Sequence, residues 1–498
     1  MVRLLFALIL GFPVLWAGVQ GQVSDGVRGL AGVRVYPDRP PRVRPTTLPP
    51  VAITDAEGRF SLDLASSDTV VAVEKSGWTR DLVPVAELGQ PVRLRPAPAF
   101  RRERVLVARL DFPDQPPLRS DAELRAILFS RQPGAASAAN YFYEISKGSL
   151  ELEEGVLLHL DDREPPRPRD DGQRSALVKG VLGRIRDLKL GPLDRVDNAT
   201  GALRPDGKPD HLWVIPPGPP RSVTTDPTHL TAINFLMPLP WDPTVQWPVV
   251  FFTDETPLGF IVHEALHGMG EHRVDDFYLD CDHPLTAGHW DIMDVGQFRG
   301  WDREHRDAFP WQEDTGVSPS QPMGWTRARL WYRGRFGATV KTLTVHRYWQ
   351  GWLDPLARAP GAKPQRVVVP DPRGGGAFWE FNVRRPLGFD RGRTGDRWGP
   401  GFEGLVVARV KPALLGKGDS RGPVRVLDAH PGTAEPPRPR YPCGRWELDD
   451  AAFNRGPGET ARGQDGPLSW EVLETDPGGR MKVRIRLREA LSVKGKVQ

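Results

Sequence analysis

The pattern of hydrophobic and polar residues changes several times along this chain of 498 residues. Behind Arg3, residues 4–14 are almost entirely apolar. Between residues 23 and 97, short apolar runs such as residues 70–73 alternate with turn-forming segments rich in Gly, Pro and Asp. This spacing predicts a small domain of short strands.

Longer elements follow residue 101. Residues 105–112 form a continuous apolar strand, and Ser120-x-x-Glu123 is a capping box that predicts a helix through Phe129. The segment "SAANYFYEISKG" predicts an aromatic-faced helix that ends at Gly148, and further strands are expected at residues 211–215 and 249–252. The mixture predicts an α/β or α+β body over residues 101–333.

After residue 340 the sequence returns to strands and turns. The apolar or alternating stretches are "RVVVP", "AFWEFNV", "GLVVARV", "SWEVLE" and "MKVRIRL". The fold class expected is therefore multidomain α+β, with a small β-sandwich at residues 22–97, a mixed strand and helix body at 101–333 and a β-rich domain at 334–490.

The first 21 residues have the features of a secretory signal peptide. A short positive start, an apolar run and the small residues Ala17, Gly18 and Gly21 predict cleavage near residue 21. We therefore expect a secreted protein, extracellular or periplasmic. No later apolar run reaches spanning length, so we expect no stable membrane anchor. The two cysteines, Cys281 and Cys443, are expected either to form one disulfide or to stay free.

Composition and charge limit the classes of binding partner that are expected. Hydrophobic residues at 39% and charged residues at 26% are typical of a soluble globular protein. The net charge is only +4, and no basic stripe with interleaved aromatic residues is visible along the sequence. Binding to nucleic acid is therefore not expected. We expect a monomer.

The sharpest chemical signal is His263-Glu264-x-x-His267, an H-E-x-x-H sequence. On a helix, residues four apart lie on one face, so both imidazoles can reach one zinc ion. Glu264 then lies beside the open coordination position and can act as general base. The apolar residues 257–262 suit a buried helix, and Gly270 can end it.

The third zinc ligand is less obvious from the residues. The extended pattern H-E-x-x-H-x-x-G-x-x-H places glycine at Gly270, but its last position holds Arg273, which cannot bind zinc. His272 lies one residue short of that position. The other donors within reach along the sequence are Asp275, Asp276 and Asp280.

A second cluster lies downstream in "GHWDIMDVG". Met293 could form the methionine-containing turn that metzincins place beneath their zinc ion. His289 and Asp291 could contact the substrate or support the ligands. The acidic loop around Asp282 and His283 could hold a structural calcium ion.

Four stretches, taken in order, resemble the immune inhibitor A family of secreted bacterial metallopeptidases. They are "VLVARLDFPD…NYFYEISKGSLELEEGV", "LGFIVHEALHGMG…DDFY", "GHWDIMDVG" and "FWEFNVRRPLGFDRG…GLVVARV", and together they run from about residue 104 to 455. The resemblance implies a metzincin-like zincin catalytic domain over residues 101–333, a β-rich region after it and endopeptidase activity on protein or peptide substrates. Residues 22–97 resemble the transthyretin-like regulatory domain appended to carboxypeptidases.

The resemblance also implies a third ligand. The family's pattern continues from the helix glycine directly into a Leu-Pro-Asp-Leu-Tyr-like segment, whose Asp binds the metal. Here residues 271–273 intervene, and treating them as an insertion aligns residues 274–278 with that segment. Asp276 then becomes the third ligand beside His263 and His267, with His272 as its rival.

Two functions remain open at this point. The first is a secreted zinc endopeptidase in which Glu264 activates water. The alternative is a catalytically inactive binding or adhesion protein on a zincin scaffold, which the altered third-ligand region keeps open. A carboxypeptidase fits less well, because its motif differs. A role for residues 22–100 as a pro-segment also stays open.

Overall fold

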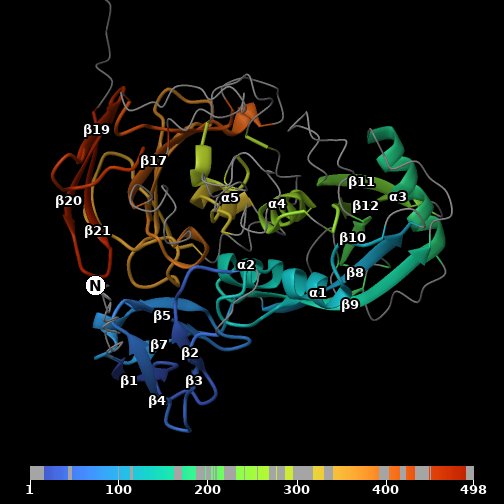
Figure 1. The fold of residues 1–498 in the computed structure, drawn as a ribbon. Coiled ribbons are helices and arrows are strands. Elements are labelled where there is room, and N and C mark those ends of the chain that lie inside the picture. The colour runs from blue at the N-terminus through green and yellow to red at the C-terminus, as the bar shows by residue number, and fades with distance from the viewer. Residues whose placement is uncertain are drawn as a thin grey trace, which may run out of the picture.

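In the computed structural model, the described residues are 16–42, 48–98, 100–112, 116–161, 171–186, 210–217, 232–239, 242–254, 256–268, 276–277, 286–294, 318–329, 340–391, 403–415, 422–431 and 450–488, together with 194, 197, 204, 205, 207, 296 and 448. These residues form several sheets with helices between them (Figure 1). The expected mixture of strand and helix is found.

The N-terminal unit is a two-layered β structure. One sheet has the order β4-β1-β7, with β1 (Trp16–Ser24), β4 (Arg59–Ala65) and β7 (Val92–Arg93). The other has the order β3-β2-β5-β6, with β2 (Arg34–Pro37), β3 (Ala52–Ile53), β5 (Val70–Glu74) and β6 (Asp81–Pro84). Both sheets contribute to one apolar core, as the predicted sandwich requires.

The predicted signal peptide overlaps this unit. β1 begins at Trp16 and pairs with β4 from Trp16 through Gln22, so cleavage near residue 21 would fall inside β1. Cleavage itself stays a prediction. Across the part of the chain that is described, no helix is long and apolar enough to cross a membrane.

The central sheet has the order β11-β12-β10-β8-β9. Its strands are β8 (Arg101–Asp111), β9 (Leu150–Asp161), β10 (His211–Ile215), β11 (Ile233–Leu239) and β12 (Asp242–Phe251). Adjacent strands from β12 to β9 are parallel, and β11 is antiparallel at the edge. The strands predicted at residues 105–112, 211–215 and 249–252 all lie in this sheet.

Helices cover both faces of the central sheet. On one face lie α1 (Asp121–Phe129), α2 (Ala138–Ile145) and α4 (Leu258–Gly268), packed on Val105, Val107 and neighbouring residues. On the other face α3 (Asp171–Ile185) packs against Leu106, Ala108 and their neighbours. Burial on both faces explains the continuous apolar run in β8, because parallel strands covered by helices have no polar side.

Local sequence explains how the first two helices begin and end. Ser120 and Glu123 form the predicted capping box at the start of α1. Ser137 caps α2, and after the helix Lys147 and Gly148 adopt positive φ values of 55° and 83°. A Cβ at Gly148 would lie 2.4 Å from the carbonyl oxygen of Trp78, so glycine permits close contact with the N-terminal unit.

The C-terminal unit is a second β-sandwich. One sheet has the order β13-β15-β16-β17-β18, with β13 (Thr342–Thr344), β15 (Arg366–Pro370), β16 (Phe378–Arg384), β17 (Gly404–Val410) and β18 (Val424–Val426). The other has the order β14-β21-β20-β19, with β14 (Tyr348–Leu353), β19 (Arg462–Asp465), β20 (Leu468–Thr475) and β21 (Met481–Leu487). All five strands predicted after residue 340 are present.

β17 joins this sandwich to the central body. Leu405 and Val407 face the core of the sandwich, whereas Val406 and Ala408 face the cluster that contains α4. The short helix α5 (Gly324–Arg329) packs against β16. Because successive side chains of β17 point to opposite faces, this one strand packs against both units.

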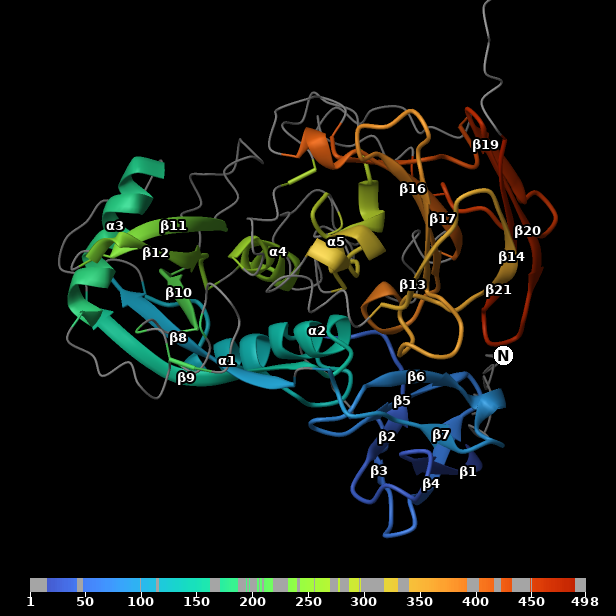
Figure 2. The same ribbon diagram turned by 180° about the vertical axis from the view of Figure 1, so that it is seen from behind.

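The N-terminal sandwich lies against α2 and the C-terminal unit. Arg80 contacts Glu74 of its own unit at 3.3 Å and Glu144 of α2 at 3.0 Å. Arg358 of the C-terminal unit contacts Asp81 at 3.1 Å. In both views α2 lies between this sandwich and α4 (Figures 1 and 2), so the described part of the sandwich does not cover the H-E-x-x-H helix.

Candidate metal centre

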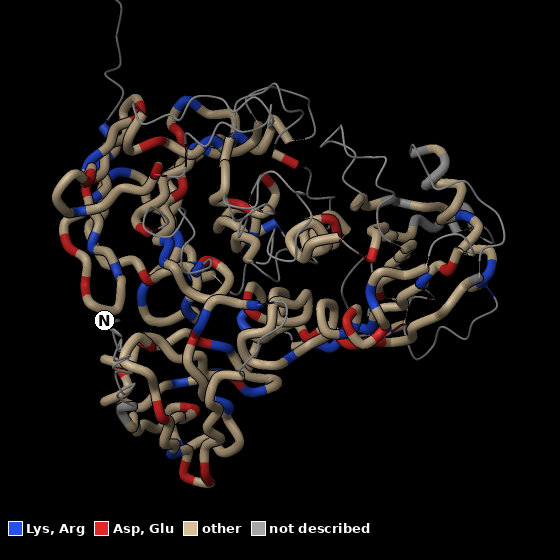
Figure 3. Tube along the Cα trace, in the orientation of Figure 1, with Lys and Arg blue, Asp and Glu red and all other residues tan. Residues whose placement is uncertain are grey.

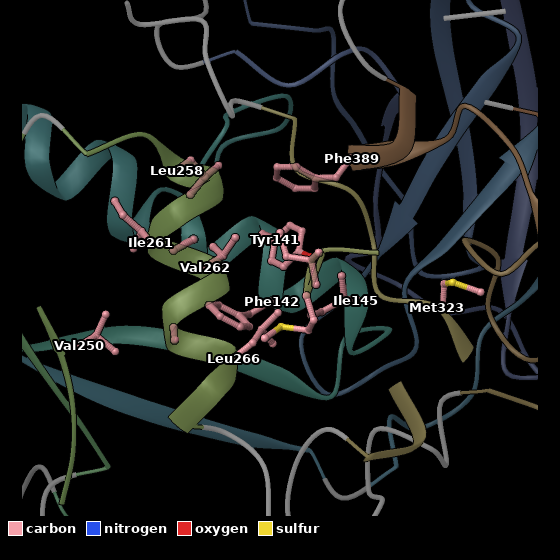
Figure 4. Close-up of a cluster of buried hydrophobic side chains, with 14 of the residues drawn as sticks. Tyr141, Phe142, Ile145, Val250, Leu258, Ile261, Val262, Leu266, Met323 and Phe389 are labelled. Atoms are coloured by element: carbon pink, nitrogen blue, oxygen red, sulfur yellow. The ribbon is translucent and has the colours of Figure 1, made fainter. Parts of the chain in front are cut away.

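Helix α4 presents the H-E-x-x-H residues from a buried position. Leu258, Ile261, Val262 and Leu266 belong to the core cluster that includes Tyr141, Phe142 and Ile145 of α2 (Figure 4). Packing of this apolar face fixes the rotation of the helix. His263 and His267 are themselves buried, with 1% and 6% of their surfaces exposed.

Three potential ligand atoms converge beside α4. The Nε2 atoms of His263 and His267 lie 3.2 Å apart, and Oδ1 of Asp276 lies 2.9 Å from the first and 3.3 Å from the second. Zinc bonds of about 2.0–2.2 Å at tetrahedral angles place ligand atoms about 3.3 Å apart. The triangle formed by these three atoms is therefore close to the size that one tetrahedral ion requires.

Asp276 differs in burial between its two ends. Its side chain is 37% exposed as a whole, but Oδ1 is enclosed and lies 2.9 Å from Nε2 of His263. A buried carboxylate oxygen is costly unless a cation compensates it, and either the imidazolium of His263 or a metal ion can do so here. The enclosed oxygen is the one directed at the two imidazoles.

Backbone carbonyls of the segment from Asp291 to Asp294 accept hydrogen bonds from His263 and from the residue after Asp276. The carbonyl oxygen of Ile292 accepts a hydrogen bond from Nδ1 of His263 at 2.7 Å. A carbonyl only accepts, so Nδ1 carries a proton, and in the neutral imidazole the lone pair of Nε2 faces the other ligand atoms. The next carbonyl, that of Met293, accepts from the backbone N–H of Phe277 at 2.9 Å and so anchors the residue that follows Asp276.

Two buried carboxylates maintain this segment. Asp294 accepts hydrogen bonds from the backbone N–H groups of Ala287 at 2.6 Å and Gly288 at 2.7 Å. Asp291 accepts from the backbone of Met293 at 2.9 Å and from the hydroxyl of Thr326 at 2.6 Å. Burial raises the pKa of Asp291 to about 6 despite these bonds.

Glu264 lies beside the three ligand atoms. Its Oε2 is 3.9 Å from Nε2 of His267, and 15% of its side chain is exposed. Burial raises its pKa, and the neighbouring imidazoles and a hydrogen bond from the backbone N–H of Asn234 oppose the rise. Asn234 belongs to the edge strand β11, so the carboxylate lies between the histidine pair and the edge of the sheet.

The charges within the cluster are strongly coupled. Burial alone would lower the pKa of His263, but the carboxylate of Asp276 outweighs it and raises that pKa to about 9. Burial would raise the pKa of Asp276, but the charges of His267 and His263 outweigh it and hold that pKa far below its usual range. Without a metal, the site therefore holds an imidazolium–carboxylate pair near neutral pH.

The structure brings together His263, His267 and Asp276, with Glu264 adjacent. His289 is buried, and its carbonyl accepts a hydrogen bond from Ser320. Asp291 supports the backbone of the 291–294 segment. The other residues considered from the sequence lie outside the described residues: Gly270, His272, Arg273, Asp275, Asp280, Cys281, Asp282, His283 and Cys443. The calcium and disulfide predictions therefore stay untested.

Sequence reasoning missed three contributors: the carbonyl of Ile292, the amide of Asn234 and the carboxylate of Asp294. The first two are backbone groups that any residue could supply, so the sequence carries no signal for them. Asp294 was within reach, because "DIMD" places a second acid beside the Met293 turn.

Comparison with known protein families finds no family model that matches this chain, and no curated protein matches it. The resemblance to the immune inhibitor A metallopeptidases therefore stays a prediction. The geometry of the cluster is the main support for a function.

Proposed function

We propose that this protein is a secreted zinc-dependent endopeptidase. The observation that carries the proposal is the convergence of His263, His267 and Asp276 on one point beside Glu264. Two imidazole nitrogens and one carboxylate oxygen are a common catalytic zinc donor set. Structural zinc sites instead use four protein ligands, so three described donors favour an open site.

The residues fit a zinc ion by their chemistry as well as by their spacing. The hydrogen bond from Nδ1 of His263 to Ile292 leaves Nε2 as the metal-binding nitrogen, and the enclosed Oδ1 of Asp276 is directed at both imidazoles. When bound, zinc would supply Lewis-acid polarisation of the scissile carbonyl and lower the pKa of a water molecule.

Glu264 would act as the proton carrier. Its carboxylate lies next to the cluster, where it can accept a proton from the attacking water and transfer it to the leaving amine. The raised pKa moves the carboxylate toward the range in which both steps proceed near neutral pH. His263 and His267 would remain ligands throughout.

The edge strand β11 supports a polypeptide substrate. Among the described strands, β11 pairs only with β12, and its Asn234 lies at the hydrogen-bonding distance of Glu264. An extended peptide can add to such an edge through backbone hydrogen bonds. A substrate bound in this way would pass Glu264 with its own backbone exposed to attack.

The test is Glu264→Gln in the full chain. We expect this variant to bind zinc as the wild type does, because the ligands remain, and to cleave casein at least ~100-fold more slowly, because the base is lost. The matched variant His263→Ala should lose both zinc and activity. Zinc content is measured by metal analysis and cleavage with and without chelator.

The outcomes separate the proposal from its alternative. A wild-type protein that binds zinc stoichiometrically but cleaves no protein substrate would favour the inactive binding protein. Unchanged casein cleavage by Glu264→Gln would remove Glu264 from its proposed role. Absence of zinc binding by the wild type would reject the metal centre itself.

A further inference from the structure

The outer face of the sheet β14-β21-β20-β19 carries an ordered set of cations and aromatic rings. Alternate residues of these strands, including Leu353, Val483 and Ile485, are buried in the core of the C-terminal sandwich. The residues between them therefore point away from the core. We call the following six residues the basic–aromatic face: Tyr348, Gln350 and Trp352 of β14 with Lys482, Arg484 and Arg486 of β21.

The register between β14 and β21 pairs each β14 residue of this face with a cation. Tyr348 lies opposite Arg486, Gln350 opposite Arg484 and Trp352 opposite Lys482. The guanidinium of Arg486 lies 6.0 Å from the centre of the Tyr348 ring, and the ammonium of Lys482 lies 5.9 Å from the Trp352 ring. Between them, Arg484 donates to the side-chain oxygen of Gln350 at 3.0 Å.

This arrangement leaves ring and cation surface accessible. Tyr348 is 57% exposed, one of the most exposed large apolar residues in the described chain. Successive outward residues on a strand are about 6.6 Å apart, so Tyr348 and Trp352 stand about 13 Å apart along β14. The face therefore offers two aromatic platforms, each beside a cation, in line with the strand.

The neighbouring strand supplies a limited number of negative charges. Glu471 of β20 contacts Arg484 at 3.0 Å and Arg462 at 2.7 Å, and Glu474 contacts Lys482 at 3.0 Å. Arg486 instead lies opposite Ser469 on that side. Figure 3 shows the basic and acidic positions interspersed along these C-terminal strands. The three cations of β21 and Arg462 outnumber the carboxylates of Glu471 and Glu474, which leaves an excess of positive charge.

We propose that the basic–aromatic face binds an anionic polysaccharide. Aromatic rings pack against the apolar faces of sugar rings, and guanidinium groups bind carboxylates through paired hydrogen bonds. Gln350 and Ser469 add groups that suit sugar hydroxyls. The distance between the two ring–cation pairs suits a polysaccharide in which uncharged sugars separate the charged ones.

The acidic residues favour this ligand over nucleic acid. A nucleic-acid strand carries a negative charge about every 3.4 Å. Such a backbone laid across the face would meet Glu471 and Glu474, which would repel it. A glycan with more widely spaced charges can place hydroxyls there, because carboxylates accept hydrogen bonds from hydroxyls.

The position of the face leaves the metal centre open. The C-terminal strands and the central sheet lie at opposite sides of the molecule in both ribbon views, with α4 between them (Figures 1 and 2). Binding of a polysaccharide would therefore hold the protein at an anionic matrix while the α4 centre stays accessible. This inference does not depend on the proposed peptidase activity.

The test is affinity electrophoresis of the full-length protein in native gels containing hyaluronate, in which every second sugar carries a carboxylate. We expect retarded migration at low ionic strength that weakens with added salt, and little retardation by neutral dextran. The double variant Tyr348→Ala/Trp352→Ala should weaken binding at least about tenfold, and Arg486→Gln severalfold.

The matched control is Arg59→Gln, which removes an arginine that is also exposed from a strand of the N-terminal sandwich. It should bind hyaluronate as the wild type does. Thermal unfolding of each variant shows whether it is folded. Equal retardation of wild type and the aromatic double variant, or no retardation of the wild type at low salt, would overturn the proposal. Tighter binding of single-stranded DNA than of hyaluronate would assign the face to nucleic acid instead.

Discussion

Asp276 should reveal its role through the pH dependence of zinc binding. In the metal-free protein the carboxylate of Asp276 raises the pKa of His263 to about 9, so at pH 7 the imidazole must lose a proton before it can bind zinc. Two pH units of proton competition weaken the apparent affinity about 100-fold. The carboxylate of Asp276 therefore has two effects: it supplies a zinc ligand, and at neutral pH it raises the affinity of His263 for the proton that competes with zinc.

Substitution of Asp276 by Ala removes both effects. The variant loses a ligand, which should weaken zinc binding by more than the ~10- to 100-fold typical of a supporting residue. The pKa of His263 should fall toward its ordinary value of about 6.5, so the variant meets little proton competition at pH 7. As the pH rises to 9, the wild type deprotonates and binds more tightly, whereas the variant changes little.

The affinity gap between wild type and Asp276→Ala should thus widen from pH 7 to pH 9 by on the order of 10- to 100-fold. Competition with a chromophoric chelator measures zinc affinity at each pH, and His272→Ala is the companion variant. His272→Ala should bind zinc within a few-fold of the wild type. Equal affinity of Asp276→Ala and the wild type at pH 9 would reject Asp276 as a ligand, and a large loss in His272→Ala would identify its rival.

Three further predictions concern the stability of the fold and the export of the protein. Asp294→Ala leaves the N–H groups of residues 286–288 without their acceptor, so the free energy of unfolding should fall by about 3 kcal/mol or more in chemical denaturation. Gly388→Ala should destabilise more than Gly376→Ala. Both glycines have positive φ, which costs alanine about 1–2 kcal/mol at either position. Only at Gly388 would the new Cβ also lie 1.9 Å from the buried Glu144. Equal losses of unfolding free energy in the two variants would contradict this clash. N-terminal sequencing of the exported protein should begin near Gln22, and a start at Met1 would reject the signal peptide.

Elements with local determinants could be predicted from the sequence. The capping box at Ser120 and the alternation within the C-terminal strands depend on residues a few positions apart, and the structure has both. Helix α3 was missed because Gly172, Gly180 and Gly183 weaken its helical propensity, and its packing on the sheet compensates. Tertiary contacts overrode the local preference there.

In the candidate metal centre, too, only some of the residues could be predicted from the sequence. His263 and His267 could be paired from spacing alone, because four residues make one helical turn. Asp276 could be chosen only through a family resemblance. No side-chain pattern marks the backbone groups of Ile292 and Asn234, because every residue other than proline offers the same N–H and C=O. Such groups become visible only when the fold assigns each one a neighbour.

The basic–aromatic face shows the same limit on a larger scale. Read along the chain, no basic stripe contains aromatic residues, because the rings of β14 and the cations of β21 are separated by 134 residues at Gln350 and Arg484. Antiparallel pairing brings them into one row, in which each ring acquires a cation. A shift of this register by one residue would turn Tyr348 and Trp352 into the core and dismantle the face. Burial of Leu353, Val483 and Ile485 on the opposite side opposes that shift, so the hydrophobic core that stabilises the sandwich also determines its surface chemistry.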